Sequence, residues 1–122
     1  MSDKKIFDIH ERIYNWVIKV IKFTQRLPKT QQNLILVKQL IASVTSVGAN
    51  DQEADAVNSK KDFVAKYSIA RKECNESVFW IKVCRDTNEN QDTKEVEELL
   101  REGKEIFLII STIMKNAQKG VI

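Results

Sequence analysis

Apolar residues recur at steps of three and four along most of the chain, a spacing typical of one buried face of an α-helix. The most regular stripe covers residues 63–84 and has a heptad period. Similar stripes cover residues 6–27, 34–48 and 96–113, and polar or proline-containing segments separate them. The pattern therefore predicts four helices, over residues 6–27, 31–57, 60–86 and 93–118.

Several residues fit the predicted helix boundaries. The first helix must end before Pro28, because the residue before a proline avoids the helical backbone conformation. Thr30 is a candidate N-cap of the second helix. Ser59 begins a Ser-Lys-Lys-Asp sequence that resembles a capping box, and either Asp92 or Thr93 can cap the last helix.

The composition supports helices and argues against a sheet protein. The 122 residues include three Gly and one Pro, whereas a β-sandwich or barrel needs a turn roughly every 8–12 residues. A chain of this length fits one domain with its own core. We therefore predict a single all-α domain over residues 1–122, folded as an up-down-up-down four-helix bundle.

Two expectations concern packing. Small side chains fill residues 42–49, so we expect the closest helix crossing there. Phe23, Val78, Trp80 and Phe107 are expected to form a second, outward apolar surface that homo-oligomerisation would cover. The alternative is that a small bundle simply has wide apolar stripes.

The cysteines and the apolar runs bear on the compartment. Cys74 and Cys84 lie in one predicted helix, about 15 Å apart along its axis, which is too far for a disulfide. Reduced thiols are typical of cytosolic proteins. The first residues lead into no apolar signal core, and the longest apolar run, residues 106–110, is far too short to span a bilayer. We predict a cytoplasmic protein without a membrane partner.

The sequence shows little catalytic chemistry. His10 is the single histidine, and no second ligand or base lies at a suitable spacing from it. The chain contains no CxxC or ExxH pair, and its glycines are too isolated to form a phosphate-binding loop. We therefore predict no enzyme, no catalytic or metal-binding residue and no cofactor.

The net charge of +3 conceals an uneven distribution. Residues 12–50 contain six cations and no acid, a net charge of +6, whereas residues 86–105 contain eight acids and three cations, a net charge of −5. Helical spacing places four of the cations on one stripe of the first helix. The six candidate nucleic-acid-binding residues are Arg12, Lys19, Lys22, Arg26, Lys29 and Lys38.

Two interpretations of this charge remain open. The basic stripe can follow a phosphate backbone, with affinity gained from released counterions. Alternatively, the first helix lies beside the fourth and the two charged stripes pair across the bundle, as exposed ion pairs of small individual energy. Charge alone favours the second interpretation.

The middle of the chain adds a family resemblance. Residues 39–53 (QLIASVTSVGANDQE) match the pattern Q-L-x-x-[SA]-x-x-S-[IV]-x-x-N-x-x-E. Residues 61–64 (KDFV) and 67–70 (YSIA) follow, and residues 72–81 (KECNESVFWI) match K-E-x-x-E-[ST]-x-[YF]-W-[LI]. Together they resemble the four-helix-bundle family of 23S ribosomal RNA intervening-sequence proteins, which includes the accessory variability-determinant protein of diversity-generating retroelements.

The resemblance implies a bundle that assembles into a ring-like homopentamer. In the retroelement relative, a basic surface is associated with nucleic acid and with a reverse-transcriptase partner. This chain departs from the pattern at Asp51 and Ala54, and Asp51 adds negative charge at the end of the second helix. For Asn50, Glu53 and Trp80 we expect structural roles, with Glu53 paired to Lys60 or Lys61.

These observations lead to one hypothesis and one alternative. The hypothesis is a non-enzymatic homo-oligomeric bundle that binds RNA or DNA electrostatically. A second candidate set of cations lies on the third helix: Lys60, Lys61, Lys66, Arg71 and Lys72. The alternative is a protein-interaction scaffold that docks a partner such as a nucleic-acid enzyme and uses its charge asymmetry for subunit or helix pairing.

Overall fold

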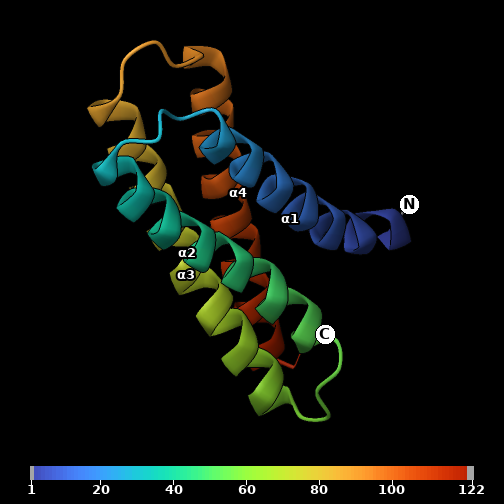
Figure 1. Cartoon of the computed structure of the whole chain (residues 1–122). Coiled ribbons are helices and arrows are strands. Elements are labelled where there is room, and N and C mark those ends of the chain that lie inside the picture. Colours follow the sequence, from blue (N-terminus) through green and yellow to red (C-terminus); the bar gives the residue numbers. More distant parts are fainter. Residues whose placement is uncertain (1, 121–122) are drawn as a thin grey trace.

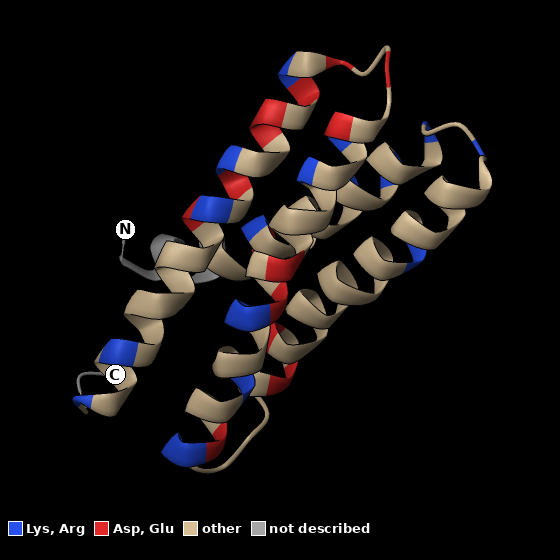
Figure 2. Ribbon diagram, turned by 90° about the vertical axis from the view of Figure 1, so that its left-hand side faces the viewer, with Lys and Arg blue, Asp and Glu red and all other residues tan. Residues whose placement is uncertain are grey.

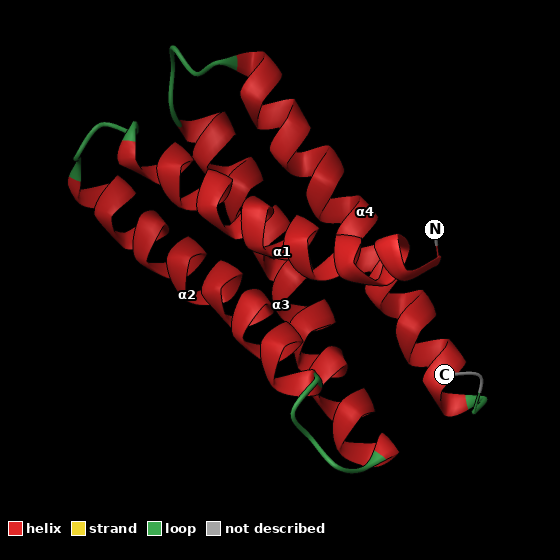
Figure 3. Ribbon diagram, turned by 90° about the vertical axis from the view of Figure 1, so that its right-hand side faces the viewer, coloured by secondary structure: helices red, strands yellow, loops and turns green. Residues whose placement is uncertain are grey.

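The computed structural model describes the backbone of residues 2–120 and the side chains of residues 9–120. Within that range the chain forms four helices that alternate in direction: α1 (Ser2–Gln25), α2 (Gln31–Ala54), α3 (Lys60–Thr87) and α4 (Thr93–Gln118) (Figure 1). Short loops join them (Figure 3). The predicted all-α four-helix bundle is confirmed.

The helix ends differ from the prediction by a few residues. α1 ends two residues early, because the amides of Arg26 and Leu27 turn back to the carbonyls of Phe23 and Thr24. α2 ends three residues early, where the Ala56 amide donates to the Glu53 carbonyl. α1 also begins four residues before the predicted start. The bounds of α4 match the prediction.

Each predicted cap is present. The side chain of Thr30 accepts a hydrogen bond from the Asn33 amide, and that of Ser59 accepts one from the Asp62 amide. Asp92, rather than Thr93, caps α4 by accepting from the Glu95 amide. These bonds satisfy backbone donors that a helix leaves without an internal partner.

The helices do not pack equally. α2 packs along α3, and α3 packs along α4, in antiparallel pairs. α1 contacts α2 and α4, crosses the bundle obliquely, and carries its N-terminal turns beyond it (Figures 1 and 3). The two helices α1 and α4 therefore lie next to each other along one face of the molecule.

The core contains the apolar stripes that the sequence predicted. Trp16, Tyr67 and Phe23 are its largest fully buried side chains. The α3 seam is buried from Tyr67 to Cys84. Cys74 and Cys84 are both free and buried.

Two of the four residues predicted to form an outward apolar surface are buried instead. Phe23 and Val78 are buried, at 1% and 7% exposure, because Phe23 continues the α1 core stripe and Val78 fills the space beside Gly103. Trp80 and Phe107 are partly buried against the core. The large apolar residues that are exposed instead are Tyr14, Leu34, Ile35, Ile69, Phe79 and Leu108.

The tightest glycine lies outside the small-residue stretch. A Cβ on Gly103 would lie 2.8 Å from both Trp16 and Val78. A Cβ on Gly48 would make an ordinary contact of 3.4 Å with Val17. Ser43 lies within the small-residue stretch of α2. Its hydroxyl accepts a hydrogen bond of 2.8 Å from the Ser77 hydroxyl of α3 and so joins the two helices.

A pair of amides joins two connections at one end of the bundle. Asn33 Nδ2 donates to Asn88 Oδ1 at 2.8 Å, and Asn88 Nδ2 donates back to Asn33 Oδ1 at 3.1 Å. Asn33 also donates to the Pro28 carbonyl at 2.8 Å. The start of α2, the α1–α2 connection and the end of α3 are thereby held together.

Candidate functional site

A groove of about 550 Å³ runs between α1 and α4, with a basic wall and an acidic wall. Its floor contains Trp16 from α1 and Leu99 from α4. Trp16 Nε1 donates to the Leu99 carbonyl at 3.0 Å, which satisfies the indole in a buried position. The charged and polar residues of its walls are Arg12, Asn15, Lys19, Lys22, Arg26, Glu95, Glu98, Arg101 and Glu102.

Two of the predicted cations pair with α4 across this groove. Arg12 donates from Nε and Nη2 to the two carboxylate oxygens of Glu102, at 2.9 and 2.7 Å, and lies 3.6 Å from Glu105. Arg26 forms an ion pair with Glu95. The hydrogen bond from Arg12 holds the pKa of Glu102 below its ordinary value. For these two cations, pairing within the bundle is the arrangement in the structure.

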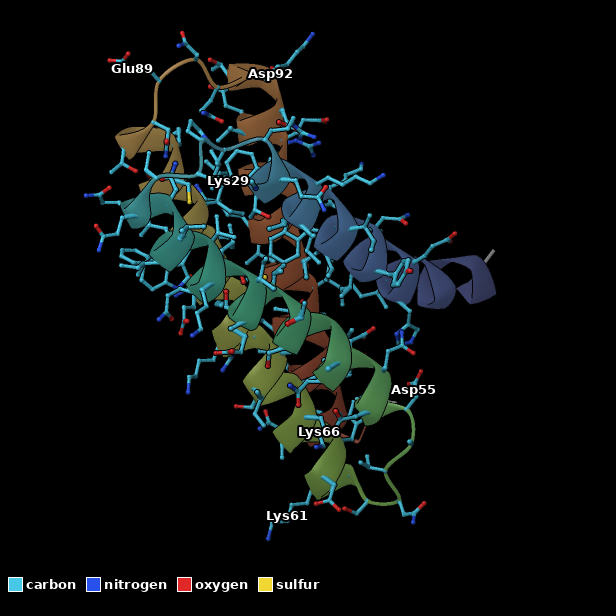
Figure 4. All side chains as sticks on the ribbon, viewed as in Figure 1. Lys29, Asp55, Lys61, Lys66, Glu89 and Asp92 are labelled. Carbon is cyan, nitrogen blue, oxygen red and sulfur yellow. The ribbon has the colours of Figure 1, made fainter. Side chains whose placement is uncertain are left out.

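The other four predicted cations are exposed, and they lie at three places on the molecule. Lys19 and Lys22 line the groove, and Lys19 acts electrostatically on Glu102. Lys29 lies on the α1–α2 connection, at the end of the bundle that also carries Glu89 and Asp92 (Figure 4). Lys38 lies on α2. Among the described residues, no ion pair within 4 Å involves any of these four lysines.

The second candidate set behaves differently. Lys66 forms an ion pair with Glu53 at 2.7 Å, so the expected partner of Glu53, Lys60 or Lys61, is wrong. The Arg71 guanidinium lies over the Phe107 ring, 5.9 Å from its centroid. The three remaining members of the set, Lys60, Lys61 and Lys72, are exposed.

Two further motif residues, Asn50 and Trp80, make hydrogen bonds within their own helices. Asn50 Nδ2 donates to the Ser46 carbonyl at 2.9 Å within α2. Trp80 Nε1 donates to Glu76 at 3.2 Å, and its ring meets Phe79 edge to face.

A buried polar cluster was missed by sequence reasoning. Asp51 is completely buried, and its carboxylate accepts from the Tyr67 hydroxyl at 2.7 Å and contacts His10 Nδ1 at 3.0 Å. His10 Nε2 lies 3.2 Å from Asp55. The one available signal was Asp51 itself, an acid at a position with helical core spacing. His10 is 41 residues away in sequence, so its partner could not be inferred.

The buried tyrosine and the two buried thiols are held in their neutral forms. Burial, with the Asp51 carboxylate beside it, raises the pKa of Tyr67 far above its ordinary value. Burial also raises the pKa of the Cys84 thiol to about 11 and that of Cys74 to about 12. Thiols with such pKa values carry little thiolate and react slowly. Within residues 9–120, no His, Cys, Asp and Glu side chains gather into a group of three suited to a metal ion.

The comparisons with known proteins decide the family. The family model described as 23S rRNA-intervening sequence protein matches residues 5–112. The chain belongs to this family.

One solved structure supports the assignment of this intervening-sequence family member. It is a protein of unknown function from the S23 ribosomal protein family of Bacteroides thetaiotaomicron VPI-5482. It is similar with a TM-score of 0.79 and 27% identity, over 88% of this chain and 98% of that one. No curated protein matches the chain. None of the helices in the described part of the chain is both long and apolar enough to cross a membrane.

Proposed function

We propose that this family member is a non-enzymatic homo-oligomeric bundle that binds RNA or DNA electrostatically. The observation that carries the proposal is the set of four exposed lysines in the acid-free segment 12–50: Lys19, Lys22, Lys29 and Lys38. Such lysines can neutralise phosphates and release counterions. The family description, which refers to an intervening sequence of 23S rRNA, supports a nucleic-acid partner.

The binding test is a filter titration with labelled single-stranded RNA and duplex DNA, at about 50 and 200 mM salt. We expect affinity for at least one of them to fall steeply as salt rises. The variant Lys22→Glu/Lys29→Glu/Lys38→Glu should bind more weakly and show a shallower salt dependence. Absent or salt-independent binding of the unmodified protein to both probes would contradict the proposal.

The assembly has its own test. The exposed apolar residues Leu34 and Ile35 offer surface for a subunit interface, and the family resemblance suggests a pentamer. Light scattering should give a mass several times that of the 14.1 kDa chain. A mass near one chain across micromolar concentrations would contradict the oligomer.

The second candidate function is the protein-interaction scaffold. The observation that favours it is the pairing of Arg12 and Arg26 with Glu102 and Glu95, since part of the basic stripe already has partners inside the bundle. Under this function, reversing Lys22, Lys29 and Lys38 would leave capture of a nucleic-acid enzyme unchanged. The same variant therefore separates the two functions.

A further inference from the structure

A second basic face, distinct from the α1–α4 groove, runs along α3 and α4. It contains eight cations. On α3 they extend from the first turn to Lys82 near the C-terminal end, and on the α4 side they extend from Lys104 near mid-helix to Lys119 just past the helix end. Blue segments recur along α3 and at the C-terminal end of α4 in Figure 2, and the labelled Lys61 marks that end in Figure 4. We call this set the α3–α4 basic face: Lys60, Lys61, Arg71, Lys72, Lys82, Lys104, Lys115 and Lys119.

Helical spacing places these cations on one side. Residues eleven apart in an α-helix are separated by about three turns and share a face. Lys61 and Lys72 have this spacing on α3, and Lys104 and Lys115 have it on α4. Each pair is therefore about 16 Å apart along its helix.

Contacts between α3 and α4 fix the direction of the face. The Arg71 guanidinium over the Phe107 ring shows which flank of α3 borders α4. A third row with the eleven-residue spacing, Lys60, Arg71 and Lys82, includes this residue. Arg71 lies over Phe107, and Cys74 Sγ contacts the Gly103 carbonyl. Because the two helices are antiparallel, this register places Lys72 at about the level of Lys104, and Lys61 at about the level of Lys115.

Most acids of the same two helices lie on other sides of them. On α3, Lys66 pairs with Glu53 of α2, and this marks the opposite flank, which Asp62 and Glu73 share by helical spacing. Glu76 lies four residues after Lys72 and borders the face, where Trp80 Nε1 donates a hydrogen bond to it at 3.2 Å.

On α4, Glu102 and Glu105 are turned toward Arg12 of α1. Two further acids that border the face, Asp86 and Glu97, lie at its far end, where α3 finishes and α4 begins.

The cations are also available. Six of them are exposed and show no ion pair with a described residue: Lys60, Lys61, Lys72, Lys104, Lys115 and Lys119. In the α1–α4 groove, by contrast, three glutamates face the cations directly. An anion therefore meets less repulsion on the α3–α4 basic face than in the groove.

We infer that the α3–α4 basic face binds a phosphodiester backbone, as a second nucleic-acid surface on this molecule; this inference rests on the proposed function. Two rows of lysines present point charges over about 16 Å without a recognition helix entering a groove. Contacts of this kind neutralise phosphates without reading bases. Exposed Leu108 and Phe79 share the face and offer apolar surface to unstacked bases.

The sharpest test uses a matched pair of lysines on one helix. Lys94 and Lys104 are both exposed on α4, but Lys94 lies among the acids at its start. With labelled single-stranded RNA between about 50 and 200 mM salt, Lys104→Glu should weaken binding and lower the salt slope by about one contact. Lys94→Glu makes the same charge change and should leave both unchanged.

A stronger variant removes the two rows together. Lys61→Glu/Lys72→Glu/Lys104→Glu/Lys115→Glu should lower RNA affinity at least tenfold, with a salt slope smaller by about 3. Circular dichroism and a thermal midpoint confirm that the variant is folded. Replacing the same four lysines by arginine should retain binding.

The outcomes separate this inference from the proposed function. If the unmodified protein binds neither probe, both fail. If it binds RNA and the four-lysine α3–α4 variant binds equally well with the same salt slope, the inference is overturned and the proposed function stands. Equal losses in Lys94→Glu and Lys104→Glu would also overturn it, because they would reflect net charge rather than this face.

Discussion

At the scale of single residues, the most informative position is Asp51. A fully buried carboxylate is costly unless it is paired and hydrogen-bonded. Here the Tyr67 hydroxyl and the His10 ring meet it, from α3 and α1 respectively. This chain therefore carries an acidic side chain in its core together with the groups that satisfy it.

Removing one of these groups should be costly. Tyr67→Phe deletes the hydroxyl that donates to Asp51 and leaves a buried acceptor short of a partner. We expect a loss of about 1–3 kcal/mol in the free energy of unfolding, measured with urea. Tyr14→Phe removes the hydroxyl of a tyrosine that is 62% exposed and should change stability very little. Equal effects in the two variants would contradict this account of Asp51.

A second residue-scale prediction concerns two glycines. Gly103→Ala places a methyl group 2.8 Å from the rigid Trp16 ring and from Val78, so we expect a loss of about 1–3 kcal/mol. Gly48→Ala meets only an ordinary contact and gains helix propensity, so it should be neutral or stabilising by up to about 1 kcal/mol. Thermal midpoints of both variants test the contrast, and it fails if Gly103→Ala is as stable as Gly48→Ala.

At the scale of elements, the four helices could be predicted from sequence because their signals are local. The period of the apolar residues, Pro28 and the capping side chains determine each helix within a few residues. The positions of Phe23 and Val78 could not be predicted, because their burial depends on how far apart neighbouring helices lie. The candidate site was partly predictable: charge indicated an α1–α4 pairing, but which cations pair depends on the oblique crossing of α1.

The ion pair between Arg12 of α1 and Glu102 of α4 leads to a prediction about stability and pH. Since Arg12 lowers the pKa of Glu102, the stabilisation from this pair is complete above the ordinary glutamate pKa and is lost as pH falls through the lowered value. Glu102→Gln has no proton to take up there, so its stability should fall less steeply on acidification.

The Arg12 partner provides the control. Arg12→Gln should flatten the same acidic part of the stability profile, and the double variant should flatten it no further. Urea unfolding at a series of acidic pH values measures all three variants. Parallel profiles for Glu102→Gln and the unmodified protein would rule out this pair as the source.

At the scale of the whole molecule, charge is separated along the bundle while the core is continuous. Acidic residues cluster around the α3–α4 connection and the first turns of α4, whereas the α3–α4 basic face extends to the opposite end of the bundle (Figure 2). The buried thiols lie inside the core, with Cys74 Sγ 3.2 Å from the Gly103 carbonyl. They can therefore report on opening of the whole bundle.

We expect the thiols to react with a disulfide reagent only after the bundle opens. Their raised pKa values and complete burial leave almost no reactive thiolate in the native state at neutral pH. The reaction rate should fall to near zero without denaturant and follow the unfolded fraction as urea is added. Fast reaction of both cysteines in native protein would contradict the buried seam.

The long sequence separation between α1 and α4 has a consequence during synthesis. The Trp16 indole donates to the carbonyl of Leu99, which is 83 residues later in the sequence, and Arg12 pairs with Glu102, which is 90 residues later. The ribosome completes α1 first, yet the groove-side partners of α1 appear only with the last helix. While the chain is being made, α2 and α3 can pair as neighbours, whereas the Trp16 side of α1 stays uncovered. The nascent chain therefore leaves the Trp16 indole without its Leu99 partner until α4 has been made.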